Sequence, residues 1–176
     1  ARVEIKLPVV VNFIDKSENI LVGGVVANVF LKASGIDIKK SLTDDNLLDE
    51  AKKLLANSNV VIPNDYVFSN DMILDAGPKT LEKFSEIIKR SKIIIWNGTL
   101  GKAEIENLSQ GTKVITEAII NSGAFSIVGG GDTIAFIEKN YLIDKFSYVS
   151  TGGGAMLHFL SGKKMPGLEA LNYYDI

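Results

Sequence analysis

Short apolar runs rich in β-branched residues alternate along the chain with longer stretches that carry apolar residues at helical spacing. The short runs predict strands at residues 19–22, 60–63, 92–96, 125–128 and 147–150. The longer stretches predict helices at residues 26–33, 44–56, 80–90, 112–121, 132–140 and 155–160. This alternation is typical of an α/β domain, a parallel sheet with helices on both faces. Because the strands are almost wholly apolar, we expect them to be buried on both sides.

Glycines follow three of the predicted strands where each gives way to a helix. Gly-Gly occurs at residues 23–24, Gly-Gly-Gly-Asp at 129–132 and Gly-Gly-Gly at 152–154. Glycine lets backbone amides approach a ligand that a Cβ would block, and helix N-termini offer unpaired N–H groups to anions. With the loops expected at residues 65–75 and 97–99, these turns would share one sheet edge. The pattern predicts a polyphosphate site, with Asp132 next to a Mg²⁺ held partly by water and phosphate.

Composition and absent motifs exclude several classes of protein. The chain has 176 residues, enough for one domain, and a formal charge of −2, which argues against a general nucleic-acid binder. It has no apolar run of membrane-spanning length, no signal-like start and no cysteine, so we expect no membrane partner and a cytoplasmic location. Neither the Walker A pattern nor Gly-x-Gly-x-x-Gly occurs, which disfavours a P-loop enzyme and an NAD-dependent dehydrogenase.

Each candidate residue also has a structural interpretation. A glycine pair between strand and helix often serves packing alone, and Asp132 suits a helix N-cap. Trp96 fits core packing, and His158, the only histidine, lies in an apolar run and is expected to be structural or on the surface. On charge alone, Arg2 and Lys6 would be solvent-exposed.

Six short motifs occur in a fixed order. They are Ala-Arg-Val-Glu-Ile-Lys at residues 1–6, Val-Gly-Gly at 22–24, Leu-Asp-Ala-Gly-Pro-Lys-Thr at 74–80, Trp-Asn-Gly-Thr-Leu-Gly at 96–101, Gly-Gly-Gly-Asp-Thr at 129–133 and Ser-Thr-Gly-Gly-Gly-Ala at 150–155. With the tail at residues 162–171, they resemble the C-terminal, nucleotide-binding domain of phosphoglycerate kinase. The resemblance covers essentially the whole chain, with Arg2 in place of the family's lysine and Thr99 in place of its proline.

The resemblance implies a Rossmann-like three-layer fold over residues 1–176, the C-terminal half of a two-domain enzyme. It implies the glycolytic reaction in which a phosphoryl group passes reversibly between 1,3-bisphosphoglycerate and ADP, giving 3-phosphoglycerate and ATP. Mg-ADP or Mg-ATP would bind here, and the phosphoglycerate on an N-terminal domain of a monomeric parent enzyme. We expect that domain and the first strand of this one to be absent from the chain, which would then be inactive alone. The alternative is a catalytically inactive nucleotide-binding module of the same fold.

The resemblance also assigns roles residue by residue. Around the transferring phosphoryl group it places Arg2, Lys6, Gly152, Gly153 and Gly154. For nucleotide binding it assigns Lys6, Gly23, Gly24, Leu74, Asn97, Thr99, Glu104, Gly130, Gly131, Asp132 and Thr133. Within that set, Gly23, Gly24 and Leu74 would form the adenine slot and Glu104 would bind the ribose. Asp132 is the residue expected to bind the magnesium.

Overall fold

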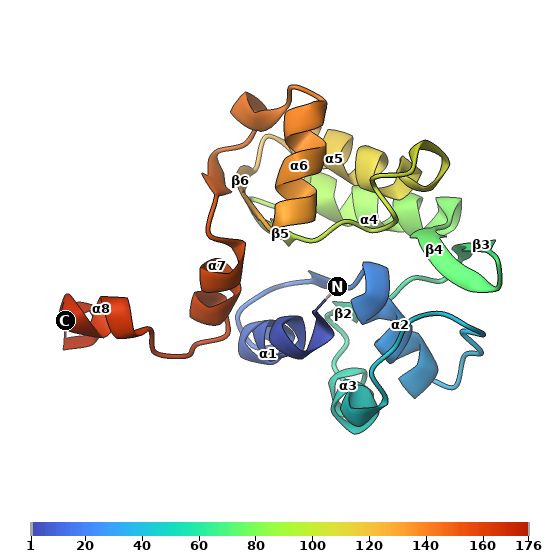
Figure 1. Cartoon of the computed structure of the whole chain (residues 1–176), viewed down its shortest axis with the longest axis horizontal. Helices are drawn as coiled ribbons and strands as arrows, with labels where there is room; N and C mark the ends of the chain where they lie inside the picture. Colours follow the sequence, from blue (N-terminus) through green and yellow to red (C-terminus); the bar gives the residue numbers. More distant parts are fainter. Residues whose placement is uncertain (1, 176) are drawn as a thin grey trace.

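The computed structural model describes residues 2–175, and its elements alternate as the sequence predicts (Figure 1). The helices are α1 (Val3–Phe13), α2 (Gly24–Ala33), α3 (Leu48–Leu54), α4 (Pro78–Arg90), α5 (Gln110–Ser122), α6 (Gly131–Lys139), α7 (Gly153–Leu160) and α8 (Pro166–Ala170). The strands are β1 (Ile20–Leu21), β2 (Val60–Val61), β3 (Tyr66–Ser69), β4 (Met72–Ala76), β5 (Ile93–Asn97), β6 (Phe125–Gly129) and β7 (Tyr148–Ser150). Short 3-10 helices occur at Asp45–Leu47, Glu106–Leu108, Ile143–Lys145 and Tyr173–Asp175.

Parallel pairing in the order β5–β6–β7 forms the largest sheet, with Ile95 opposite Ile127 and Asn97 opposite Gly129. The α/β fold class with a parallel sheet is therefore confirmed. The strands do not all join one ladder, however. β1 and β2 are two residues long each and bond in parallel to one another, separately from the larger sheet.

Two segments differ from the sequence-based expectation. Residues 65–75 were expected to be a strand-end loop, but most of them lie in the antiparallel hairpin of β3 and β4. Its turn contains Asn70 and Asp71, both at positive φ, the geometry that tight hairpins need. Helix α1 was not expected, because it contains Pro8 and its apolar residues, including the run at residues 9–11, show no clear helical period.

Helices α4, α5 and α6 lie over one face of the β5–β6–β7 sheet (Figure 1). Their apolar residues meet Trp96 and Val128 of the sheet in one cluster, so the expected core role of Trp96 is confirmed. A second cluster joins α1, α2 and α3 around Leu7 and Phe30. On the other sheet face, Ile93 and Phe125 stay exposed at 67% and 55%, so the expectation that the strands are buried on both sides is wrong for this sheet.

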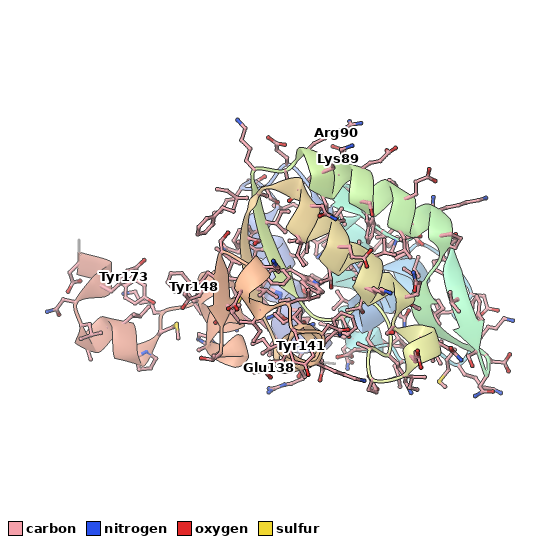
Figure 2. The ribbon with its side chains drawn as sticks, turned by 90° about the horizontal axis from the view of Figure 1, so that it is seen from above. Lys89, Arg90, Glu138, Tyr141, Tyr148 and Tyr173 are labelled. Atoms are coloured by element: carbon pink, nitrogen blue, oxygen red, sulfur yellow. The ribbon has the colours of Figure 1, made fainter. Side chains whose placement is uncertain are left out.

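The charged residues at the end of α4 agree with helix electrostatics. Lys89 and Arg90, in the last turn of α4, point outward (Figure 2), where their charge complements the helix dipole. The C-terminal segment, α8 with residues 173–175, projects from the body in both views (Figures 1 and 2). No helix within residues 2–175 is both long and apolar enough to cross a lipid bilayer.

Gly77, the N-cap residue of α4, has no side chain to cap the helix, and Asp65, which comes earlier in the sequence, caps it instead. The Asp65 carboxylate accepts the backbone N–H of Lys79 at 2.9 Å and of Thr80 at 2.7 Å, and the Thr80 hydroxyl at 2.7 Å. Burial acts to raise the pKa of Asp65, but these hydrogen bonds outweigh it and lower that pKa. A Cβ at Gly77 would overlap this carboxylate, so glycine is required there.

We expect Asp65→Ala to lower the free energy of unfolding by about 1 kcal/mol, the usual effect of losing a helix cap. The folded-state pKa of Asp65 lies below its unfolded value, so its contribution is present at neutral pH and is lost as pH falls through the folded pKa. Urea unfolding at pH 7 and pH 2.5 measures this, with the exposed Asp15→Ala as control. An equal difference between variant and wild type at both pH values would contradict it.

Candidate functional site

Lys6 marks the centre of the candidate site. Its ammonium lies 3.4 Å from the carbonyl oxygen of Asn97, and a Cβ at Gly98 would overlap it. Burial lowers the pKa of Lys6, and the negative charge of Asp132 opposes that shift. Within residues 2–175 no carboxylate lies within ion-pair distance of this ammonium. A half-buried cation without an ion-pair partner suits an incoming anion.

Asn97 ends β5 directly beside Lys6. Its side-chain Nδ2 is buried and has no hydrogen-bond partner, although buried donors are nearly always paired. A Cβ at Gly130, where φ is +99°, would lie 3.3 Å from that nitrogen. The next amide, Gly98 N–H, donates to Thr133 Oγ1 at 2.9 Å. Asn97 therefore carries an unpaired donor that lies against Gly130 at the carboxyl end of the sheet.

The two glycine turns after β6 and β7 pack on each other. A Cβ at Gly153 would lie only 2.9 Å from the backbone N and Cα of Gly130, so no other residue fits there without displacement. This contact brings the starts of α6 and α7 together. Asp132 lies in the first turn of α6, while Gly130 occupies the N-cap position that the structural interpretation gave to Asp132. The N-termini of α6 and α7 therefore lie together, and the free backbone N–H groups of a helix N-terminus suit an anion.

The residues predicted to form the adenine slot lie close to the segment after β5. Gly24 has φ of +58°, and a Cβ there would lie 2.9 Å from the carbonyl oxygen of Thr99. A Cβ at Gly23 would lie 3.1 Å from the Leu100 side chain. The structure thus brings the turn after β1 against the segment after β5, although these segments are far apart in sequence.

Leu74 is joined to the same segment, because its carbonyl oxygen accepts the N–H of Lys102 at 3.2 Å. The structure does not bring every predicted residue together. Arg2 is exposed and its Nε lies 3.4 Å from the Glu4 carboxylate, so it contacts a neighbour rather than Lys6. Glu104 is exposed on the turn after Lys102. The roles assigned to these residues stay predictions.

A magnesium ion would find one carboxylate here. Among residues 2–175, no three metal-binding side chains cluster together, and Asp132 is exposed at the start of α6. That donor set fits Mg²⁺, which keeps several waters and is commonly bound through one carboxylate and the phosphates of a nucleotide. Gly152 and Gly154 are exposed beside it, with no atom near enough to crowd a Cβ at Gly154.

Sequence analysis missed two residues that hold the site together. Gly98, at φ +100°, admits the Lys6 side chain, and Asp75 contacts the backbone on both sides of the Glu104 segment. Gly98 follows Asn97 in an Asn-Gly pair, a turn signal that pointed to positive φ. Asp75 stands inside the motif at residues 74–80, but nothing in the sequence showed which backbone it would meet.

Comparison with known proteins gives the family. The family model described as phosphoglycerate kinase matches residues 1–163. The chain belongs to the phosphoglycerate kinase family. It is 43% identical to the phosphoglycerate kinase of Francisella philomiragia in an alignment 195 positions long, which covers 97% of this chain and 50% of that relative. The chain thus spans about half the length of the curated relatives it matches.

Solved structures of the phosphoglycerate kinase family agree. The structure of phosphoglycerate kinase from Coxiella burnetii matches with a TM-score of 0.90 at 38% identity, over 98% of this chain and 50% of that one. The enzyme from Pyrococcus horikoshii matches with a TM-score of 0.85 at 35% identity and the same coverage. The predicted resemblance to phosphoglycerate kinase is therefore confirmed.

We expect Lys6→Met to stabilise the ligand-free chain by about 1 kcal/mol, because methionine keeps the apolar stem and removes a partly desolvated charge. The folded pKa of Lys6 lies below its unfolded value, so the charged lysine destabilises the wild type less as pH rises toward 10. The difference in stability between Lys6→Met and the wild type should therefore shrink. Thermal unfolding at pH 7 and pH 10 measures both effects. The exposed Lys113→Met is the control. A destabilised Lys6→Met at pH 7 would contradict the expectation.

Proposed function

We propose that residues 1–176 form the nucleotide-binding domain of a phosphoglycerate kinase, the C-terminal half of that enzyme. The reaction is reversible phosphoryl transfer between 1,3-bisphosphoglycerate and ADP, giving 3-phosphoglycerate and ATP in glycolysis. One observation carries the proposal. The Lys6 ammonium lies against the Asn97 carbonyl oxygen at the carboxyl end of β5, and the unpaired Asn97 side-chain amide lies against Gly130, where two glycine turns meet.

The chemistry of phosphoryl transfer explains why such a site suffices. The reaction needs positioning and neutralisation of charge more than covalent participation by the protein. Lys6 would bind the nucleotide phosphates and the transferring group, with Arg2 stabilising the same developing charge. The amides of Gly152, Gly153 and Gly154 would donate to the oxygens of the moving phosphoryl group, an electrostatic contribution fixed in advance by the fold.

Binding of the nucleotide would use the rest of the site. Asp132 would hold Mg²⁺, which when bound neutralises the charge of the phosphate oxygens. Thr133, Gly130 and Gly131 would lie along those phosphates, and Asn97 would donate its free N–H. At the other end, the adenine would lie between the pair Gly23-Gly24 and Leu74, beside Thr99, with Glu104 on the ribose.

The phosphoglycerate would be held by the remaining half of the two-domain enzyme, which must approach this one for an in-line transfer. The proposal places the reaction in the cytoplasm and in a monomeric parent enzyme. A second function, a nucleotide-binding module without catalysis, is favoured by one observation. Arg2, where the family has lysine, is 73% exposed at its side chain and lies against Glu4 instead of facing the site.

Titration of the chain with ADP by calorimetry tests the proposal, with and without Mg²⁺ and with NADH as the control ligand. We expect magnesium-dependent ADP binding and no NADH binding. Asp132→Asn should weaken Mg-ADP binding by roughly tenfold through loss of one charge-assisted contact and leave binding of metal-free ADP nearly unchanged. Equal ADP affinity with and without Mg²⁺ in the wild type would contradict the metal assignment.

Reconstitution separates the two functions. The chain is mixed with the N-terminal half of the Francisella philomiragia relative, and ATP-dependent phosphorylation of 3-phosphoglycerate is measured. Activity that requires both halves supports the kinase. The binding module is supported if the mixture binds ADP but shows no activity. If Arg2→Lys then restores activity, Arg2 alone prevents catalysis in the natural sequence.

A further inference from the structure

Asp75, at the end of β4, is a buried carboxylate that the proposed reaction does not use. Its side chain is 3% exposed and accepts the N–H of Ala76 and of Gly111, each at 2.8 Å. Within residues 2–175 no lysine or arginine forms an ion pair with it. Burial raises the pKa of Asp75, although the two hydrogen bonds act to lower it. A buried carboxylate without a counter-ion costs stability, so its presence needs a reason.

The Asp75 carboxylate contacts both ends of one segment, residues 101–111, whose middle, residues 104–107, is exposed. A Cβ at Gly101 would lie 2.6 Å from Asp75 Oδ1, and a Cβ at Gly111 would overlap the same oxygen. A Cβ at Gly101 would also overlap the carbonyl oxygen of Leu108, so the segment closes on itself. This is the geometry of an Ω-loop, a compact surface loop whose ends lie together. Asp75 occupies the point where the two ends meet.

The segment carries Glu104, and the residue before Asp75 is Leu74. The Leu74 carbonyl oxygen accepts the N–H of Lys102 at 3.2 Å, which ties the strand to the loop a second time. Residues 104–107 are otherwise exposed, with little of the body to hold them. The distance between Leu74 and Glu104 is therefore set by the contacts around Asp75.

We propose that Asp75 is a positioning residue for the nucleoside, holding the 101–111 segment so that Glu104 meets the ribose while Leu74 lines the base. This inference rests on the proposed function, which supplies the roles of Leu74 and Glu104. No described contact joins Asp75 to Lys6 or Asp132. Its effect is accordingly confined to the nucleoside end of the ligand and leaves the phosphate end unchanged.

The test uses Asp75→Asn, which keeps the size of the side chain but replaces one acceptor oxygen with an N–H donor. Either the Ala76 or the Gly111 N–H then loses its partner. Calorimetry on the whole chain compares Mg-ADP with Mg-pyrophosphate, which lacks the nucleoside. We expect ADP to bind roughly tenfold more weakly and pyrophosphate to bind as in the wild type. Equal weakening of both ligands, or of neither, would overturn the proposal.

A double-mutant cycle asks whether Asp75 acts through Glu104. If it does, the double variant Asp75→Asn/Glu104→Gln should bind ADP no more weakly than the single variant with the lower ADP affinity, because the second change removes a contact already lost. Losses that multiply would show that the two residues act independently and would overturn the positioning role. A purely structural residue would not give such a cycle.

Gly101→Ala covers the case in which Asp75→Asn fails to fold. The added methyl group would overlap both the Asp75 carboxylate and the Leu108 carbonyl oxygen, so it would displace this end of the loop from Asp75. It should give the same loss for ADP alone, whereas Gly167→Ala, where a Cβ meets no atom within 4 Å, should change nothing. If the wild type binds neither ligand, the proposed function fails and the inference with it. If it binds both and Gly101→Ala does too, only the inference fails.

Discussion

Close approach of backbone at the carboxyl ends of the strands is the constraint on which the site depends. Gly153 lies on Gly130, and Gly24 lies on the carbonyl of Thr99, each with no room for a side chain. Gly98 admits the Lys6 ammonium in the same way. These contacts join segments that come from both apolar clusters. The glycines thus do more than allow unusual backbone angles, because they set how closely the segments from the two apolar clusters approach each other.

At the same place, two polar groups lack partners, and this lowers the stability of the fold. The Lys6 ammonium is half-buried without an ion-pair partner, and the Asn97 amide has no acceptor. An unpaired buried donor costs about 1–3 kcal/mol. The cluster formed by α4, α5, α6 and the sheet offsets that cost, with Phe84, Ile119 and Ile137 at 2% exposure or less. Such groups are retained where a ligand completes them, which is why they indicate binding more strongly than the glycines alone.

The site has two ends held by different means. Around the phosphates, helix starts and strand ends fix the geometry, so little can move without unpacking α6 or α7. Around the nucleoside, an exposed segment is held by a single carboxylate and a few backbone hydrogen bonds. Segments with few buried contacts lie at the low-stability end of a fold. Under the proposed function, recognition of the nucleoside would depend on Asp75, whereas recognition of the phosphates would not.

The sequence by itself determined the α/β class, the strand–helix turns and the family, because apolar periodicity and glycine position are local properties. It did not determine the hairpin at residues 66–76, the separate pairing of β1 with β2 or the helix from Val3, where Pro8 and the apolar run at residues 9–11 hid the helical period. Only the tertiary structure decided that Lys6 reaches Asn97 and that Asp75 meets Gly101 and Gly111. Those contacts join residues from different elements, and they depend on how the elements pack, which no local sequence pattern determines.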